Sequence, residues 1–246
     1  MHASVLTRLT ATTPMAVLLD IEGTICPISF VKDVLYPYFT NKLPALLKSQ
    51  SFPLDSNSDD AVTKILTELP ADTQTHAELI QAHFDDLVKR DIKDPVLKSL
   101  QGFVWQQGYH SGEITAPVYP DAIEYIKTTS DDVYIYSLGS IKAQKLLFSY
   151  VDDAGKSVDL NPYLKGYYDI PTAGYKNQSS SYTKIAEAIG LPASEILFLS
   201  DNELEVQAAT EAGMKAKIMV RPGNYALLDI GAKYDKVHLL PEALQN

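Results

Sequence analysis

The chain has 246 residues, 46% of them hydrophobic, which is enough for one large domain or for a core domain with a smaller insert. Its formal net charge is −10 and it has no block rich in lysine and arginine, so nucleic acid and anionic membranes are poor candidate partners. No apolar run approaches the length of a membrane span. The single cysteine, Cys26, excludes an internal disulfide and fits a reducing compartment.

The first residues of the chain could be a targeting signal or a frayed terminus. Residues 1–14, MHASVLTRLTATTP, lack the apolar centre of a signal peptide. They are rich in serine and threonine and contain one arginine and no acid, so a transit peptide is conceivable. With a single arginine, a frayed terminus is the better interpretation. We therefore expect residues 1–15 to form a disordered N-terminal arm.

The next part of the chain predicts one buried strand followed by a long helical segment. Residues 16–20, AVLLD, are short, continuous and apolar, as in a strand buried on both faces. Apolar residues then recur at helical spacing over 32–47, 60–69 and 76–89. Another helix is predicted from Asp94, an N-cap acid followed by proline at the first helical position. We expect 33–115 to be an all-helical insert.

After residue 117 the pattern changes to short strands that alternate with helices. Strands are predicted at 133–137, 166–170, 196–200 and 216–220, and helices from Pro120 and Ser140 and over 181–190 and 203–212. This alternation implies a parallel sheet with helices on both faces. The predicted fold class is therefore α/β: a Rossmann-like, doubly wound parallel sheet core from 16–32 and 116–246, with a helical insert after the first strand.

Three of the predicted strands end in polar side chains, which are Asp20, Ser137 and Asp201. Each alone could be an ordinary loop residue, but in an open parallel sheet ligands bind outside the carboxyl ends of the strands. Two converging carboxylates repel each other unless a cation lies between them. Oxygen ligands select a hard cation, and Mg²⁺ also favours substrates that carry phosphate.

Four stretches, in chain order, resemble the signature motifs of the haloacid dehalogenase-like phosphatase superfamily. They are DIEGT (20–24), YSLGS (136–140), GYK (174–176) and LFLSDNELE (197–205). In that superfamily a helical cap is inserted where this chain has 33–115.

Longer runs are similar to the acireductone synthase family, the enolase-phosphatases of methionine salvage. These runs are DIEGT-x-x-PI-x-FV (20–31), YS-x-GS-x-KAQKLLF (136–148) and VRPGN (220–224). The fungal members are nearest, because of PYF (37–39) and the VW-x-x-GY-x-SG-x-I run (104–114).

The resemblance implies a role for each charged residue of these motifs. Asp20 would attack phosphorus and form an aspartyl-phosphate that water hydrolyses. Asp20 and Asp201 would hold one Mg²⁺ per chain, together with Glu22 through its backbone carbonyl. Glu22 stands where the superfamily usually has an aspartate that donates and accepts protons. Lys176 would neutralise phosphate charge and orient Asp20.

The polar residues around this set have implied roles in substrate binding. Ser137 would bond a phosphoryl oxygen. The family usually shows serine at the next position, where this chain has Leu138, so a contact there must come from the backbone N–H. Thr24 would bond the phosphate or pin its own loop. Glu205 would steady the water molecules on the metal, or it would simply lie on an exposed helix face.

The family's reaction has two steps on 2,3-diketo-5-methylthiopentyl-1-phosphate. A base first removes a proton from the carbon that carries the phosphate, and Glu22 and a cap residue are candidate bases. Dephosphorylation then gives the acireductone 1,2-dihydroxy-3-keto-5-methylthiopentene.

The second hypothesis for the function is a Mg²⁺-dependent phosphatase of another small ester, which Leu138 favours. A third hypothesis is a non-catalytic sensor of a phosphorylated metabolite, and the joint presence of Asp20, Asp201 and Lys176 argues against it.

The resemblance further implies a monomer that binds a small phosphorylated diketone, in the cytoplasm and also in the nucleus. Outside the motifs, we interpret Cys26 as a bystander and Arg221 as the brace of a loop. Trp105, Tyr109 and His110 belong either to the core or to the wall that receives the methylthio tail.

Overall fold

The computed structural model describes residues 16–90, 92 and 94–244. The expected N-terminal arm, residues 1–15, lies outside the described residues. In the described part of the chain, no helix is both long and apolar enough to cross a membrane.

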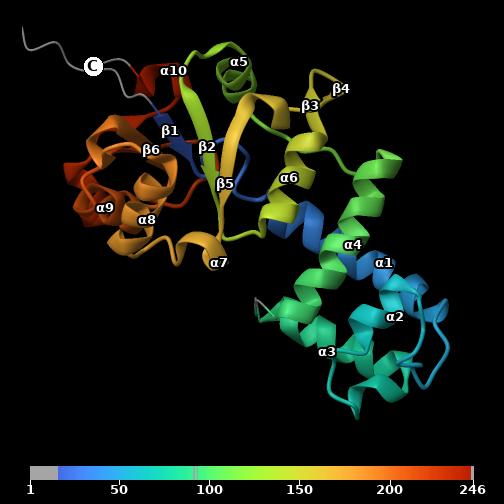
Figure 1. Cartoon of the computed structure of the whole chain (residues 1–246). Coiled ribbons are helices and arrows are strands. Elements are labelled where there is room, and N and C mark those ends of the chain that lie inside the picture. The colour runs from blue at the N-terminus through green and yellow to red at the C-terminus, as the bar shows by residue number, and fades with distance from the viewer. Residues whose placement is uncertain (1–15, 91, 93, 245–246) are drawn as a thin grey trace, which may run out of the picture. The chain divides into compact units, whose positions relative to one another are not determined.

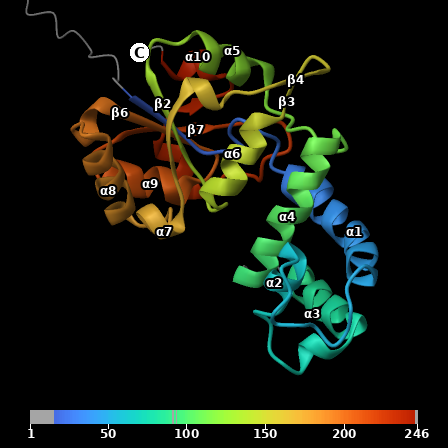
Figure 2. The same ribbon diagram turned by 45° about the vertical axis from the view of Figure 1, so that its right-hand side comes forward.

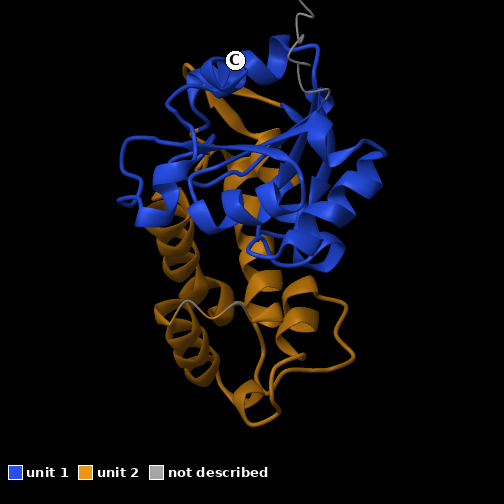
Figure 3. Ribbon diagram, turned by 90° about the vertical axis from the view of Figure 1, so that its left-hand side faces the viewer, with its two compact units in different colours: residues 1–27, 118–144, 160–246 blue, residues 28–117, 145–159 orange. Residues whose placement is uncertain are grey.

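The described chain divides into two compact units, coloured separately in Figure 3. Unit 1 holds the described residues of 1–27, 118–144 and 160–246, and unit 2 those of 28–117 and 145–159. Unit 2 takes in 145–159 because Ala116 pairs with this segment: its N–H donates to the carbonyl of Tyr150, and its carbonyl accepts from Asp152. The domain boundaries expected at residues 33 and 115 stay a prediction.

A six-stranded parallel sheet forms the centre of unit 1, in the order β5-β2-β1-β6-β7-β8 (Figure 1). The strands are β1 (Ala16–Leu19), β2 (Asp132–Tyr136), β5 (Leu164–Tyr168), β6 (Ile196–Ser200), β7 (Lys215–Met219) and β8 (Lys236–Val237). The predicted α/β class, with a helical insertion after the first strand, is confirmed.

Strand β1 lies near the middle of the sheet because every one of its residues can be buried. Ala16–Leu19 are all fully buried, and the strand pairs in parallel with β2 on one side and β6 on the other. The continuous apolar run is thus the pattern of a strand covered on both faces. This arrangement places the residues that follow β1, β2 and β6 next to one another.

Helices cover both faces of the sheet. Figures 1 and 2 show α8 and α9 on one side of the strands and α5 and α10 on the other. The helices after the insert are α5 (Pro120–Thr128), α6 (Ile141–Ser149), α7 (Ile170–Ala173), α8 (Ser179–Ile189), α9 (Glu203–Glu211) and α10 (Leu240–Ala243). One core cluster joins Leu18 and Phe198 of the sheet to Tyr182 and Ile185 of α8 and Ala208 of α9.

Unit 2 is mainly helical. Its helices are α1 (Tyr36–Lys48), α2 (Ala61–Leu66), α3 (Ala77–Lys89) and α4 (Pro95–Ser111), and β3 (Val151–Asp153) pairs antiparallel with β4 (Lys156–Val158). Asp94 caps α4 as predicted, since its side chain accepts from the N–H groups of Val96 and Leu97. Trp105 donates its indole N–H to the carbonyl of Leu35, and buried Tyr109 stacks on Tyr150.

Candidate active site

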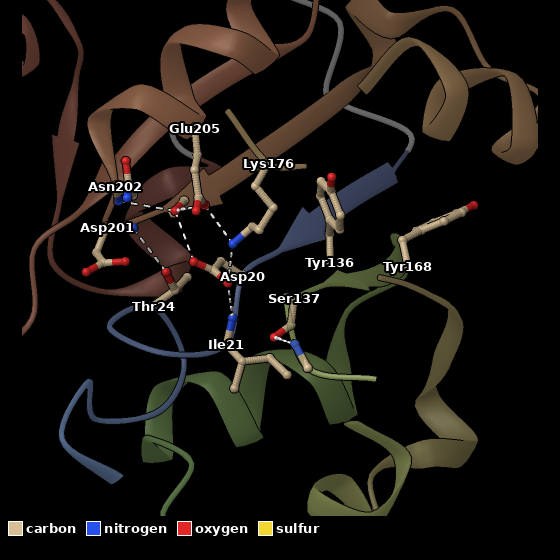
Figure 4. A network of polar contacts seen from close by, with 12 residues as sticks. Asp20, Ile21, Thr24, Tyr136, Ser137, Tyr168, Lys176, Asp201, Asn202 and Glu205 are labelled. Atoms are coloured by element: carbon tan, nitrogen blue, oxygen red, sulfur yellow. Dashed lines mark hydrogen bonds and ion pairs between the residues drawn. The ribbon is translucent and has the colours of Figure 1, made fainter. Parts of the chain in front are cut away.

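The carboxyl ends of β1, β2 and β6 bring Asp20, Ser137 and Asp201 to one edge of the sheet (Figure 4). Asp20 follows β1 directly and its N–H donates to the carbonyl of Leu199, which extends the pairing with β6 by one residue. Asp20 is buried, with 7% of its surface exposed. The ladder therefore fixes the backbone from which the carboxylate projects.

Both oxygen atoms of the Asp20 carboxylate have partners. Oδ1 lies 2.5 Å from Lys176 Nζ and accepts a hydrogen bond from the N–H of Ile21 at 2.8 Å. Oδ2 accepts a hydrogen bond from the hydroxyl of Ser200 at 3.0 Å. Charge-assisted bonds of this kind are short and strong, so they hold the plane of the carboxylate in one orientation.

Lys176 is buried and bridges two carboxylates. Its Nζ lies 2.5 Å from Asp20 Oδ1 and 2.6 Å from Glu205 Oε2, and its side chain is 4% exposed. Burial alone lowers the pKa of Lys176, but the two carboxylates outweigh it and hold the pKa above its usual range. The ammonium group therefore stays charged in the folded protein.

Glu205, in the first turn of α9, is held inside the site. Its Oε2 accepts from the hydroxyl of Ser200 at 2.8 Å, in addition to the contact with Lys176. The Ser200 oxygen also accepts from the N–H of Asn202. Because a hydroxyl carries one hydrogen, Ser200 donates to Asp20 or to Glu205 but not fully to both. The alternative that Glu205 lies on an exposed helix face is therefore wrong. The role of Glu205 near a metal stays a prediction.

Asp201 lies against the loop that follows Asp20. Its N–H donates to the hydroxyl of fully buried Thr24 at 3.2 Å, so Thr24 links the two loops. Gly23 has φ +72°, and a Cβ there would lie 2.3 Å from Asp201 Oδ2. Burial, together with the charges of Asp20 and Glu205, raises the pKa of Asp201 to about 7.

If Asp201 binds the Mg²⁺ that the resemblance implies, Gly23→Ala should displace its carboxylate and sharply reduce Mg²⁺ affinity and phosphate release. The added methyl group would overlap the carboxylate, in a backbone conformation that already costs about 1–2 kcal/mol for a residue with a side chain. Gly155→Ala is the matched control, because Gly155 has φ +83° and nothing within 4 Å of an added Cβ. Calorimetric titration with Mg²⁺ and steady-state rates distinguish the two. Equal metal affinity in both variants would show that the close approach at Gly23 is unimportant.

The site fits a divalent cation. Asp20, Asp201 and Glu205 contribute three carboxylates, against the one ammonium of Lys176. Within the described residues, no three His, Cys, Asp or Glu side chains are grouped so that they could hold a metal by themselves. A cation here would thus have at most two carboxylate ligands, and the rest would come from backbone, water or phosphate. Mg²⁺ is typically bound in this way.

The loop after β1 also contains Glu22 and Cys26. The two residues pair through their backbones, and the side chain of Glu22 is exposed while Cys26 is fully buried. Burial, reinforced by the charge of Glu22, raises the pKa of the Cys26 thiol well above its ordinary value. A thiol that stays protonated is a poor nucleophile, which supports the bystander interpretation of Cys26.

Gln144, which the sequence analysis did not single out, anchors the loop after β2. Ser137 is buried and its Oγ accepts from the N–H of Gly139 at 3.2 Å, while Leu138 is 44% exposed. Buried Gln144 donates from Nε2 to the carbonyl groups of Gly139 and Tyr168. Ser137 and the backbone N–H of Leu138 stay predicted substrate contacts.

Arg221 braces the loop that follows Asp20, as expected. Its Nε donates to the carbonyl of Thr24 at 2.9 Å, and its two terminal nitrogens bind the carboxylate of Asp121. The guanidinium lies 4.5 Å from the ring centre of Tyr119. All three guanidinium nitrogens thus bond to protein groups and hold this loop in place.

Comparison with known proteins agrees with this geometry. No family model matches the chain. The Enolase-phosphatase E1 of Scheffersomyces stipitis is 56% identical over 221 residues, 87% of this chain and 92% of that protein. The crystal structure of the UTR4 protein of Saccharomyces cerevisiae has a TM-score of 0.81 and 49% identity, and the match covers 92% of this chain and 98% of that one.

A more distant neighbour shows the fold class. The HAD-hydrolase YfnB of Bacillus subtilis, solved bound to magnesium, has a TM-score of 0.57 and 16% identity over 94% of this chain and 97% of its own. The fold is therefore that of the haloacid dehalogenase-like hydrolases. Within that class, the chain belongs to the enolase-phosphatase E1 family, which confirms the resemblance carried by the motifs.

Proposed function

We propose that this protein is the bifunctional enolase-phosphatase of methionine salvage. It converts 2,3-diketo-5-methylthiopentyl-1-phosphate and water to 1,2-dihydroxy-3-keto-5-methylthiopentene and inorganic phosphate. The observation that carries the proposal is the buried Asp20 carboxylate, held by Lys176, Ser200 and the Ile21 N–H beside Asp201. A carboxylate fixed in this way can attack phosphorus.

In the first step, a base removes a proton from the carbon that carries the phosphate, and the electron pair moves to the neighbouring carbonyl oxygen. The resulting enolate takes a proton from solvent and becomes an enol phosphate. Glu22 is our candidate base, since its exposed side chain follows the nucleophile by two residues. A protonated Glu22 can then supply the proton that the second step requires.

In the second step, an oxygen of Asp20 bonds to phosphorus and the bond from phosphorus to the substrate oxygen breaks. The leaving oxygen takes its proton from Glu22. Water then attacks the phosphorus of the aspartyl-phosphate, Glu22 accepts the water proton and releases it to solvent, and Asp20 is regenerated. Lys176 offsets the charge of the phosphate next to the anionic nucleophile.

Asp20, Asp201 and the backbone carbonyl of Glu22 would hold one Mg²⁺ per chain. When bound, the ion would screen the phosphate charge and polarise the substrate carbonyl. Ser137 and the backbone N–H of Leu138 would bind phosphoryl oxygens. Thr24, whose hydroxyl accepts from the Asp201 N–H, would contribute mainly by holding the metal-binding loops together.

The test is to supply the diketone phosphate with Mg²⁺ and to follow enediol absorbance and phosphate release separately. We expect the enediol signal to require the enzyme and phosphate release to follow it.

A plain Mg²⁺-dependent phosphatase is the second candidate function, and the exposed, hydrophobic Leu138 next to Ser137 favours it. Phosphate release from simple esters, without enediol formation from the diketone, would select this second candidate.

Removal of the metal should abolish both reactions. Excess chelator removes the cation that Asp20 and Asp201 would share, and Mg²⁺ should restore full activity. Ca²⁺ should restore little, because its longer bonds and looser coordination misplace the phosphate relative to Asp20. Steady-state rates after chelation and metal addition measure this. Full turnover in excess chelator would contradict a metal-dependent mechanism.

We also propose that the enzyme acts as a monomer in the cytoplasm and, in part, in the nucleus. The single buried thiol agrees with a reducing compartment. Sedimentation analysis of the purified chain and fractionation of cells test the two statements.

A further inference from the structure

Three consecutive carbonyl groups, ending at Lys176, each accept a hydrogen bond from a different hydroxyl group. We name the three donors, Tyr136, Ser181 and Tyr182, the hydroxyl clamp. Each donor and acceptor pair is 2.8 Å apart: Tyr136 to Gly174, Ser181 to Tyr175, and Tyr182 to Lys176.

The segment that the clamp holds has no regular structure of its own. Residues 174–178 connect α7 to α8 and belong to neither a helix nor a strand, so their carbonyl groups lack the partners of a regular ladder. The carbonyl of Tyr175 also accepts from the N–H of Gln178 at 3.2 Å. Gly174 has φ +111°, and a Cβ there would lie 2.6 Å from Ser181 Oγ. The side chain of Tyr175 is 57% exposed, whereas Lys176 is 4% exposed. The chain therefore turns from solvent to the interior within one residue.

The clamp itself is rigidly placed. Tyr136 is the last residue of β2, and Ser181 and Tyr182 lie in the first turn of α8. All three are almost fully buried, and the rings of Tyr136 and Tyr182 meet edge to face with centres 5.6 Å apart. Burial raises the pKa of both tyrosines, so their hydroxyl groups stay protonated and can donate.

We infer that the hydroxyl clamp positions Lys176 for catalysis, and this inference rests on the proposed function. A lysine side chain has a flexible four-carbon stem, so the location of its ammonium depends on where its backbone is held. Asp20 and Glu205 attract the ammonium, but a bound phosphate dianion competes with them for it. Because the clamp holds the backbone, the ammonium can contact the phosphate without leaving Asp20. The three clamp members are thus positioning residues that act through the backbone of the lysine.

The clamp can be removed one hydroxyl at a time, with the aromatic packing retained. Tyr136→Phe, Ser181→Ala and Tyr182→Phe should each lower kcat/KM on the order of ten- to a hundredfold, mainly through kcat. Tyr125→Phe is the matched control, since Tyr125 is also a buried tyrosine but its hydroxyl bonds to Asp131. It should keep wild-type kcat/KM. Equal kcat/KM for the clamp variants and the control would overturn the inference.

A second comparison separates positioning of Lys176 from a general effect on the fold. In a Lys176→Met background, Tyr182→Phe should cause little further loss of kcat/KM, because the group that it positions is already absent. If instead the losses from Tyr182→Phe and Lys176→Met multiply, the hydroxyl does not act through Lys176.

Failure of the inference and failure of the proposed function are distinguishable. All variants are assayed in parallel with the diketone phosphate and with p-nitrophenyl phosphate. If the wild-type protein hydrolyses p-nitrophenyl phosphate but not the diketone phosphate, the proposed substrate is wrong. The effect of the clamp variants is then measured as kcat/KM for p-nitrophenyl phosphate. Hydrogen exchange gives a readout independent of activity: amides of 174–178 should exchange faster in the clamp variants, with β6 unchanged. Unchanged exchange in 174–178 would refute the clamp whatever the rates show.

Discussion

Asp20→Asn should abolish phosphate release, with a loss on the order of 10⁴- to 10⁶-fold as for other enzymes that lose their covalent nucleophile. An amide cannot form the acyl-phosphate. Its shape matches that of the carboxylate, so the variant should fold. Lys176 keeps the Glu205 carboxylate at 2.6 Å, which prevents the substitution from leaving the ammonium unpaired. The measurements are phosphate release and the thermal unfolding midpoint.

The same variant tests whether the two chemical steps can be separated. If Glu22 is the base, Asp20→Asn should still remove the substrate proton, and an enol phosphate should accumulate. With the wild-type protein, borohydride added during turnover should reduce the aspartyl-phosphate and leave homoserine at position 20. Phosphate release by the variant at a rate near wild type would exclude Asp20 as the nucleophile.

The sequence predicted the strand ends of the site because each rests on a local pattern. The apolar runs before Asp20 and Asp201 correspond to β1 and β6, and the run before Ser137 corresponds to β2, within one residue. The shortest strand and helix were not predicted. Strand β8 has two residues and helix α7 has four, which is too few for a periodic pattern.

The supporting contacts of the site could not be predicted, since they join residues far apart in the chain. Ser200 bonds to Asp20 across 180 positions, and Tyr136 bonds to the carbonyl of Gly174 across 38. A serine that ends an apolar strand, or a tyrosine within one, has no sequence pattern that identifies such a partner. Only the order of the strands, with β6 beside β1 and β5 beside β2, makes these groups neighbours.

Lys176→Met should raise KM and lower kcat together, with a loss of about 2–4 kcal/mol in transition-state stabilisation. Methionine keeps the length of the side chain but removes the charge that faces both the Asp20 carboxylate and the phosphate. It also leaves two buried carboxylates without their cation, and breaking a buried pair in this way costs about 3–5 kcal/mol of stability. The thermal unfolding midpoint must therefore be measured beside the rates.

Two further variants separate the loss of catalysis from the loss of stability. Lys176→Arg keeps the charge, but its planar group cannot place a nitrogen at one point between Asp20 Oδ1 and Glu205 Oε2, at 2.5 and 2.6 Å. It should restore stability more fully than activity. Glu205→Gln combined with Lys176→Met removes one of the two unpaired charges, so it should regain stability without regaining activity. Wild-type kcat/KM in Lys176→Met would mean that the buried ammonium serves the fold alone and has no part in phosphate transfer.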